Sequence, residues 1–165
     1  MDIGIFSCIF EHFLLSKQPI TKKMNEPITI VLIDDDPINI FLAKTVMQRV
    51  ATNPTFYTFT EAKAGVEFIS NTISVLLETN PLIFLLLDID MPDLDGWQFL
   101  EEFEKLEMKH KNKLPIFMLS SSTLPSDKER ALKNRFVTDY IEKPITYEKA
   151  KLLFDQVIEK KKTHS

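Results

Sequence analysis

The chain has 165 residues, of which 44% are hydrophobic, and this suits one domain with an ordinary packed core. Its net charge of −4 disfavours a surface that neutralises phosphates, so we expect no nucleic acid among its partners. No apolar run approaches the roughly 20 residues that a membrane span needs, and the single cysteine excludes an internal disulfide. We therefore expect a cytoplasmic protein without stable membrane insertion.

The first 23 residues differ from the rest of the chain. We expect residues 1–23 to be an N-terminal extension that is disordered or not native, with Met24 as the natural start and residues 24–165 as the folded domain. The alternative is a helix that binds a membrane surface or a partner, because apolar residues recur there at helical spacing. The absence of basic residues before Lys17 disfavours the membrane version.

From Ile28 onward, short apolar runs alternate with longer helical patterns. In chain order, the predicted elements are a strand at Ile28–Ile33, a helix from Pro37, a strand at Thr55–Phe59, a helix at Glu61–Glu78, a strand at Leu82–Leu87, a helix at Gly96–Leu106, a strand at Pro115–Leu119, a helix from Ser126 to Lys133, a strand at Val137–Ile141 and a helix from Thr146 to about Lys162. The strand at 82–87 is the most apolar and is predicted to be central. Strands alternating with helices predict an α/β fold with a doubly wound parallel sheet.

Some local features are also predicted. Ser126 and Glu129 match a capping box at the start of their helix. The helix from Pro37 has apolar or small residues at helical spacing, namely Ile38, Phe41, Leu42, Thr45 and Val46. The inner face of the helix at 61–78 is predicted to carry Val66, Ile69, Ile73 and Leu76.

Reactive residues follow four of the predicted strands. In parallel sheets of this kind, ligands bind beyond the carboxyl ends of the strands. An acidic triplet, Asp34–Asp36, ends the first strand, and Asp88, Ser120 and Lys143 follow the third, fourth and fifth. Neighbouring carboxylates repel one another, so their joint ionisation needs positive charge from the lysine and from a divalent metal such as Mg²⁺. An ionised carboxylate in that setting can attack a phosphoryl donor.

Each of these residues also has a simpler interpretation. The acidic triplet before Pro37 can simply cap a helix, and Asp88 can be an ordinary loop acid. Tyr140 alone is typical of an aromatic residue at the edge of a core. The combination at four strand ends is what favours a functional site.

Four segments together resemble the receiver domain of bacterial two-component response regulators, and in particular the stand-alone receivers of Bacteroidetes. They are VLIDDDP at Val31–Pro37, LLLDIDMPDLDGW at Leu85–Trp97, PIFMLSSS at Pro115–Ser122 and DYIEKP at Asp139–Pro144. The resemblance extends over about Ile28 to Lys162. It implies a flavodoxin-like (βα)5 fold with strand order 2-1-3-4-5.

The resemblance also implies a role for each matching residue. Asp88 would accept the phosphoryl group. Mg²⁺ would be held by Asp34, Asp35, Asp88 and the backbone carbonyl of Asp90. The switch residues would be the hydroxyl of Ser120, the ring of Tyr140 and the ammonium group of Lys143, whose bond to Pro144 is often cis in the family.

The implied function is a phospho-acceptor signalling domain that catalyses only its own phosphorylation and dephosphorylation. Its partners would be a sensor histidine kinase or a histidine phosphotransfer protein, and a downstream protein target reached through the fourth and fifth helices. Two departures stand out: Asp90 occupies a position where Asn is common, and Arg135 and Phe136 stand near a position where Gly-Ala is frequent.

Two alternatives remain at this point. The sequence Asp88-Ile89-Asp90 resembles the DxD motif of haloacid-dehalogenase phosphatases, which also depend on Mg²⁺. In that family, however, the motif normally ends the first strand, whereas here it ends the third. The second alternative is a receiver-like binding module that is never phosphorylated.

Overall fold

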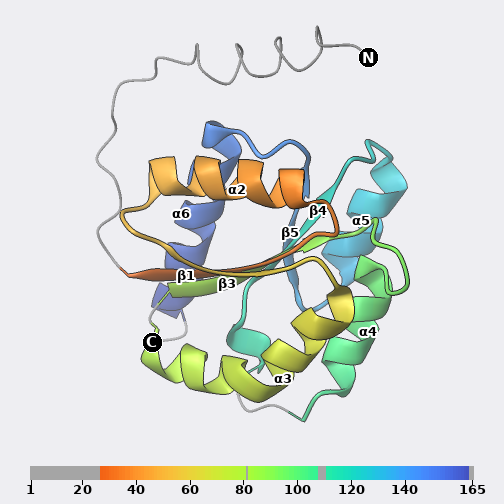
Figure 1. Cartoon of the computed structure of the whole chain (residues 1–165), viewed down its shortest axis with the longest axis horizontal. Helices are drawn as coiled ribbons and strands as arrows, with labels where there is room; N and C mark the ends of the chain where they lie inside the picture. Colours follow the sequence, from red (N-terminus) through yellow and green to blue (C-terminus); the bar gives the residue numbers. More distant parts are fainter. Residues whose placement is uncertain (1–26, 81, 108–110, 164–165) are drawn as a thin grey trace, which may run out of the picture.

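Five parallel strands form one sheet in the order β2-β1-β3-β4-β5 (Figure 1), which confirms the predicted fold and strand order. The computed structural model describes residues 27–80, 82–107 and 111–163, so the predicted extension at 1–23 lies outside the described residues. The strands are β1 (Ile28–Ile33), β2 (Thr55–Phe59), β3 (Leu82–Asp88), β4 (Ile116–Ser120) and β5 (Val137–Glu142). As predicted, β3 is central, between β1 and β4.

Helices cover both faces of the sheet (Figure 1). One face carries α2 (Pro37–Val50) and α6 (Tyr147–Thr163), and the other carries α3 (Ala62–Thr79), α4 (Gly96–Lys105) and α5 (Pro125–Lys133); a short 3-10 turn lies at Lys111–Lys113. Side chains of β3 alternate between the two layers: Phe84 faces α6, and Leu85 belongs to the layer of α3 and α4. None of the helices in the described ranges is long and apolar enough to cross a bilayer.

The residues noted at helical spacing in α2 do not all lie on its buried face. Ile38 and Phe41 are 52% and 65% exposed, and the buried stripe is instead Ile40, Ala43, Val46, Met47 and Val50. This helix has apolar residues on two adjacent faces, so their periodicity does not decide which face packs on the sheet. In α3 the prediction holds for Ile69 and Ile73, which are fully buried.

The predicted capping box at the start of α5 is wrong. The helix begins at Pro125, one residue before Ser126, because proline fits the first helical position. The hydroxyl of Ser122 instead accepts a hydrogen bond from Leu124 N and donates one to Asp127. Thr146, where the last helix was predicted to begin, lies just before α6, and its hydroxyl accepts a hydrogen bond from Lys149 N.

Candidate functional site

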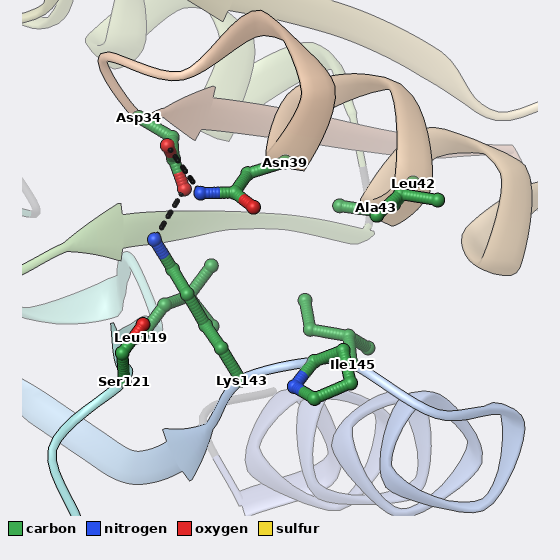
Figure 2. A pocket seen from close by; sticks show the side chains of 9 residues that line it. Asp34, Asn39, Leu42, Ala43, Leu119, Ser121, Lys143 and Ile145 are labelled. Atoms are coloured by element: carbon green, nitrogen blue, oxygen red, sulfur yellow. Dashed lines mark hydrogen bonds and ion pairs between the residues drawn. The ribbon is translucent and has the colours of Figure 1, made fainter. Parts of the chain in front are cut away.

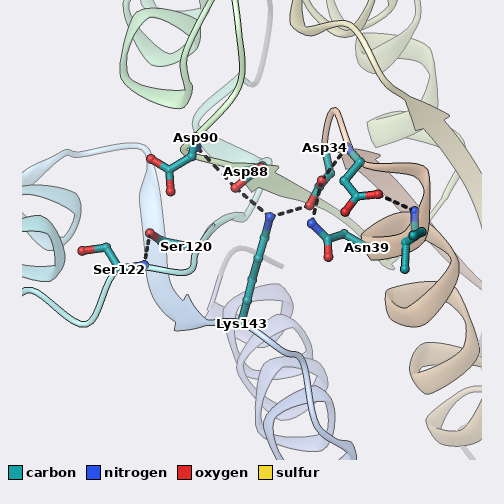
Figure 3. A network of polar contacts seen from close by, with 9 residues as sticks. Asp34, Asn39, Asp88, Asp90, Ser120, Ser122 and Lys143 are labelled. Atoms are coloured by element: carbon teal, nitrogen blue, oxygen red, sulfur yellow. Dashed lines mark hydrogen bonds and ion pairs between the residues drawn. The ribbon is translucent and has the colours of Figure 1, made fainter. Parts of the chain in front are cut away.

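The carboxyl ends of β1, β3, β4 and β5 bring the predicted polar side chains together (Figure 3). Asp34 follows β1, Asp88 ends β3, and Ser120 ends β4, and each of these residues is at most 2% exposed. Lys143 directly follows β5. Parallel strands place their carboxyl ends at one edge, so residues that are far apart in the sequence share one buried site.

Lys143 links the two buried carboxylates. Its Nζ lies 2.7 Å from Asp34 Oδ2 and 2.9 Å from Asp88 Oδ1. Burial opposes the charge of this lysine, but hydrogen bonds and attraction to the two carboxylates prevail and raise its pKa. The peptide bond between Lys143 and Pro144 is cis, as the resemblance implied.

One ammonium group does not balance the acidic groups of this site. Asp34, Asp35 and Asp88 each offer a carboxylate oxygen, and the three oxygens lie within 4.8 Å of one another. Burial raises the pKa of Asp88, and the charge of Asp34 raises it further, although Lys143 and the backbone N–H of Asp90 act against both effects. A cluster of oxygen ligands with excess negative charge suits a hard divalent cation.

The acidic triplet divides into distinct roles. The Asp36 carboxylate accepts a hydrogen bond from Ile38 N and caps α2, so the capping interpretation is correct for this residue. Asp34 faces the site instead, and its Oδ1 accepts from Asp36 N and from the side chain of Asn39. The sequence analysis missed Asn39. The sequence feature that could have indicated it is an asparagine in the first turn of a helix that begins beside clustered acidic residues.

Asp90 lies at the exposed rim of the site. Its backbone N–H approaches Asp88 Oδ1 at 3.4 Å, and the role of its carbonyl as a ligand stays a prediction. The loop that follows is closed by a hydrogen bond from Gly96 N to Ile89 O at 2.9 Å. A Cβ at Gly96 would meet Asp88 O at 2.5 Å and Ile89 Cα at 2.8 Å, so only glycine lets α4 start this close to the acceptor strand.

We expect Gly96→Ala to destabilise the protein by roughly 1–3 kcal/mol, the usual cost of overpacking, because the added methyl group meets backbone atoms. Gly65→Ala is the matched control. There the methyl group would meet the end of the flexible Ile33 side chain, and better helix propensity offsets part of the clash. Urea denaturation would measure the free energy of unfolding of both variants. A Gly96→Ala protein as stable as wild type would contradict this close approach.

Ser122 connects the end of β4 to α5 and β5. Its backbone N–H donates to Ser120 Oγ at 2.9 Å, and its carbonyl accepts from the Tyr140 hydroxyl at 2.8 Å. Its own hydroxyl donates to Asp127 Oδ2 at 2.7 Å. The two predicted switch residues Ser120 and Tyr140 are therefore joined through Ser122, which the sequence analysis did not single out.

A cavity of about 400 Å³ opens beside the acidic cluster (Figure 2). Lys143 and Asp34 form its polar end. The remaining lining comes mainly from α2 and from the loop between β5 and α6, and comprises Asn39, Leu42, Ala43, Leu119, Ser121, Pro144 and Ile145. The acidic site is thus accessible from the side of α2.

We expect Asp88→Asn to raise the melting temperature of the metal-free protein at pH 7 by a few degrees, the effect of about 1 kcal/mol in a domain of this size. The pKa of Asp88 is raised above its usual 3.8 by burial, so the folded state binds this proton more tightly than the unfolded state. The carboxyl group therefore favours folding at low pH, and this contribution is lost as the pH rises through the folded pKa.

Asparagine does not titrate, so the advantage of Asp88→Asn should shrink on acidification toward pH 4. The exposed Asp90→Asn is the control and should change little at either pH. Calorimetric scans at both pH values test the prediction. A variant that melts below wild type at pH 7 would contradict it.

Comparison with known proteins identifies the family of the chain and supports its fold. The family model of the response regulator receiver domain matches residues 30–154. The two-component response regulator ARR10 of Arabidopsis thaliana is 29% identical over 81% of this chain and 22% of its own length. The sensor histidine kinase GacS of Pseudomonas protegens is 28% identical over 71% of this chain and 12% of its own. A crystal structure of a two-component response regulator from Cytophaga hutchinsonii has a TM-score of 0.69 and 26% identity, covering 84% of this chain and 99% of that one.

The chain belongs to the response regulator receiver domain family, because the family model matches well over half of its residues. Receiver domains are signalling domains of two-component systems, and this match sets aside the haloacid-dehalogenase alternative. The chain spans less than a quarter of the length of ARR10 and of GacS.

Proposed function

We propose that the domain accepts a phosphoryl group on Asp88, with Mg²⁺ bound by the neighbouring carboxylates, and that this changes a protein-binding surface. The observation that carries the proposal is the position of Lys143, whose Nζ contacts both Asp88 Oδ1 and Asp34 Oδ2. An ordinary buried ion pair needs one carboxylate, whereas this lysine serves two, and an oxygen of Asp35 lies within 4.8 Å of oxygens of both.

The residues have separate tasks in this proposal. A carboxylate oxygen of Asp88 attacks the phosphorus atom, and the leaving group departs with the bonding electrons. Lys143 pairs with the phosphoryl oxygens, and the Ser120 hydroxyl donates a hydrogen bond to one of them. Burial keeps Asp88 away from bulk water, so few hydrogen bonds to solvent must be broken before the attack.

Asp35 and Asp34 would hold Mg²⁺, together with Asp88 and the backbone carbonyl of Asp90. The oxygen-only donor set and the excess negative charge fit this ion. When bound, it would neutralise charge on the phosphoryl oxygens during transfer. Asp35 is exposed, so this ligand is within reach of solvent.

The proposed switch begins at Ser120. Its oxygen now accepts a hydrogen bond from Ser122 N, and turning toward a phosphoryl group would take it away from that donor. Ser122 also forms hydrogen bonds with the Tyr140 hydroxyl and with Asp127 of α5, so a movement of Ser120 would be transmitted to both residues. The phosphoryl group thereby makes different contacts in two states, which is what a ligand-driven change requires.

Two kinds of protein partner follow from this proposal. The phosphoryl donor would be a sensor histidine kinase or a histidine phosphotransfer protein, and GacS shows that similar sequence occurs within a histidine kinase. The downstream target would bind the surface formed by α5 and α6. The exposed large apolar side chains of these helices are Leu132 of α5, Leu124 just before α5 and Leu152 of α6, which are 50% to 64% exposed.

A labelling experiment tests the function. Incubation with acetyl phosphate and Mg²⁺ should add one phosphoryl group per chain, in a linkage stable to acid and labile to base, and chelation of the metal should suppress uptake. Failure of the Mg²⁺-loaded protein to take up any phosphoryl group, from acetyl phosphate or from phosphoramidate, would favour a binding module that is never phosphorylated.

A further inference from the structure

Asn39 contacts the acidic site through one hydrogen bond. Its Nδ2 lies 3.1 Å from Asp34 Oδ1, and its amide oxygen points away from Asp34 (Figures 2 and 3). Asn39 is the third residue of α2, and the side chain that caps this helix is that of Asp36, not of Asn39. Here the side chain instead bonds a carboxylate five residues earlier in the chain. Helix formation therefore does not explain an asparagine at this position.

The two oxygens of Asp34 have different partners. Oδ1 accepts from Asp36 N at 3.0 Å and from Asn39, whereas Oδ2 contacts Lys143 Nζ at 2.7 Å. Each carboxylate oxygen has about two acceptor sites, so Oδ1 is filled and Oδ2 retains capacity for one more partner. The donor from Asp36 is a backbone group that almost any residue would supply. The donor from Asn39 is a side chain, and a substitution can remove it.

We propose that Asn39 is a positioning residue of the metal site: its amide holds Oδ1 of Asp34, so that Oδ2 is the oxygen presented to the cation. The inference rests on the proposed function, in which Asp34 and Asp35 hold Mg²⁺. Donation to Oδ1 also withdraws some negative charge, which acts against cation binding. Loss of a group that orients a metal ligand typically lowers affinity by about 10–100-fold, so orientation outweighs this effect.

Two substitutions separate hydrogen bonding from shape. Asn39→Leu keeps the approximate shape of the side chain and removes the donor, whereas Asn39→Ala removes both. Each replacement favours the helix more than asparagine does, which offsets part of the lost hydrogen bond to Asp34, so the metal-free melting temperature should fall only slightly. Calorimetric titration of the full chain with MgCl₂ should show affinity reduced about tenfold or more in both variants.

A kinetic measurement adds a second readout. The Mg²⁺ concentration that gives half-maximal phosphoryl uptake should rise by the same factor, while the rate at saturating Mg²⁺ stays within about twofold of wild type. Asn80→Ala is the control, because the amide of Asn80 bonds only the Thr79 hydroxyl at the end of α3 among the contacts described. Its Mg²⁺ affinity should equal that of wild type.

Asn39→Leu with wild-type Mg²⁺ affinity would overturn the inference, and so would an equal loss of affinity in Asn80→Ala. If wild-type protein binds Mg²⁺ and the Asn39 variants bind it with the same affinity, only the role of Asn39 is refuted. Wild-type protein that does not bind Mg²⁺ would refute the proposed metal site as well.

Discussion

Replacing Lys143 with alanine should destabilise the metal-free protein by about 3–5 kcal/mol, the usual cost of leaving buried charges without their partner. The Lys143 side chain is 13% exposed and contacts Asp34 and Asp88, which are almost fully buried. Its removal leaves their mutual repulsion uncompensated. Protonation of one carboxyl group limits the cost, because Asp88 already has a raised pKa.

The effect of Lys143→Ala should depend on pH in a defined direction. The pKa of Lys143 is raised above 10.5 in the folded state, so its contribution is fully present below that value and is lost as the pH rises further. Toward low pH the difference from wild type should also shrink, as Asp88 takes up a proton. Urea denaturation should therefore give similar differences from wild type at pH 7 and 9 and a smaller one at pH 5.

Lys105→Ala is the control for this experiment. Lys105 forms a 2.8 Å ion pair with Glu102, but both side chains are exposed, and such pairs typically contribute about 0–1 kcal/mol. Mg²⁺ should stabilise Lys143→Ala more than wild type, because it supplies the missing positive charge. Equal stability of Lys143→Ala and Lys105→Ala would show that Lys143 does not balance the buried carboxylates.

Asp88→Asn should abolish phosphoryl uptake, because an amide lacks the nucleophilic carboxylate oxygen. Asp88 is the acidic residue at the end of the central strand, and Lys143 Nζ lies 2.9 Å from its Oδ1. The same substitution is expected to stabilise the fold, so loss of uptake would not come from unfolding. Incorporation of radioactive phosphoryl groups from labelled acetyl phosphate measures the effect.

The control is Asp90→Asn, which makes the same chemical change two residues away at an exposed position. This variant should still be labelled once, since its backbone contact to Asp88 does not depend on the side chain. Asp88→Asn protein that takes up phosphoryl groups at the wild-type rate would refute the assignment of the acceptor.

The strands were predictable because their signals are local and strong, whereas their order was implied by the resemblance to receiver domains. A strand buried on both faces, such as Leu82–Asp88, shows as an unbroken apolar run, and parallel connections allow few arrangements. Because parallel strands place their carboxyl ends at one edge of the sheet, the positions of Asp88, Ser120 and Lys143 at that edge were also predictable. These contacts depend only on where the strands end.

Other features depend on tertiary contacts that the sequence does not display. Phe41 is as apolar as a core residue, yet it is 65% exposed, because α2 packs through its neighbouring face. The bonds of Ser122 to Tyr140 and of Asn39 to Asp34 require side-chain directions that periodicity does not supply. A proline at the first helical position likewise shifted the start of α5 away from the predicted capping box.

Chemical trapping of the phosphorylated residue tests the proposed function most directly. Borohydride reduces an acyl phosphate, so a phosphorylated aspartate becomes homoserine, which peptide mass spectrometry can locate. After treatment with acetyl phosphate and Mg²⁺, homoserine should occur at Asp88, with Asp34, Asp35 and Asp90 unchanged. Homoserine at one of those three residues with Asp88 intact, or no conversion in protein that carries the label, would contradict the proposed acceptor.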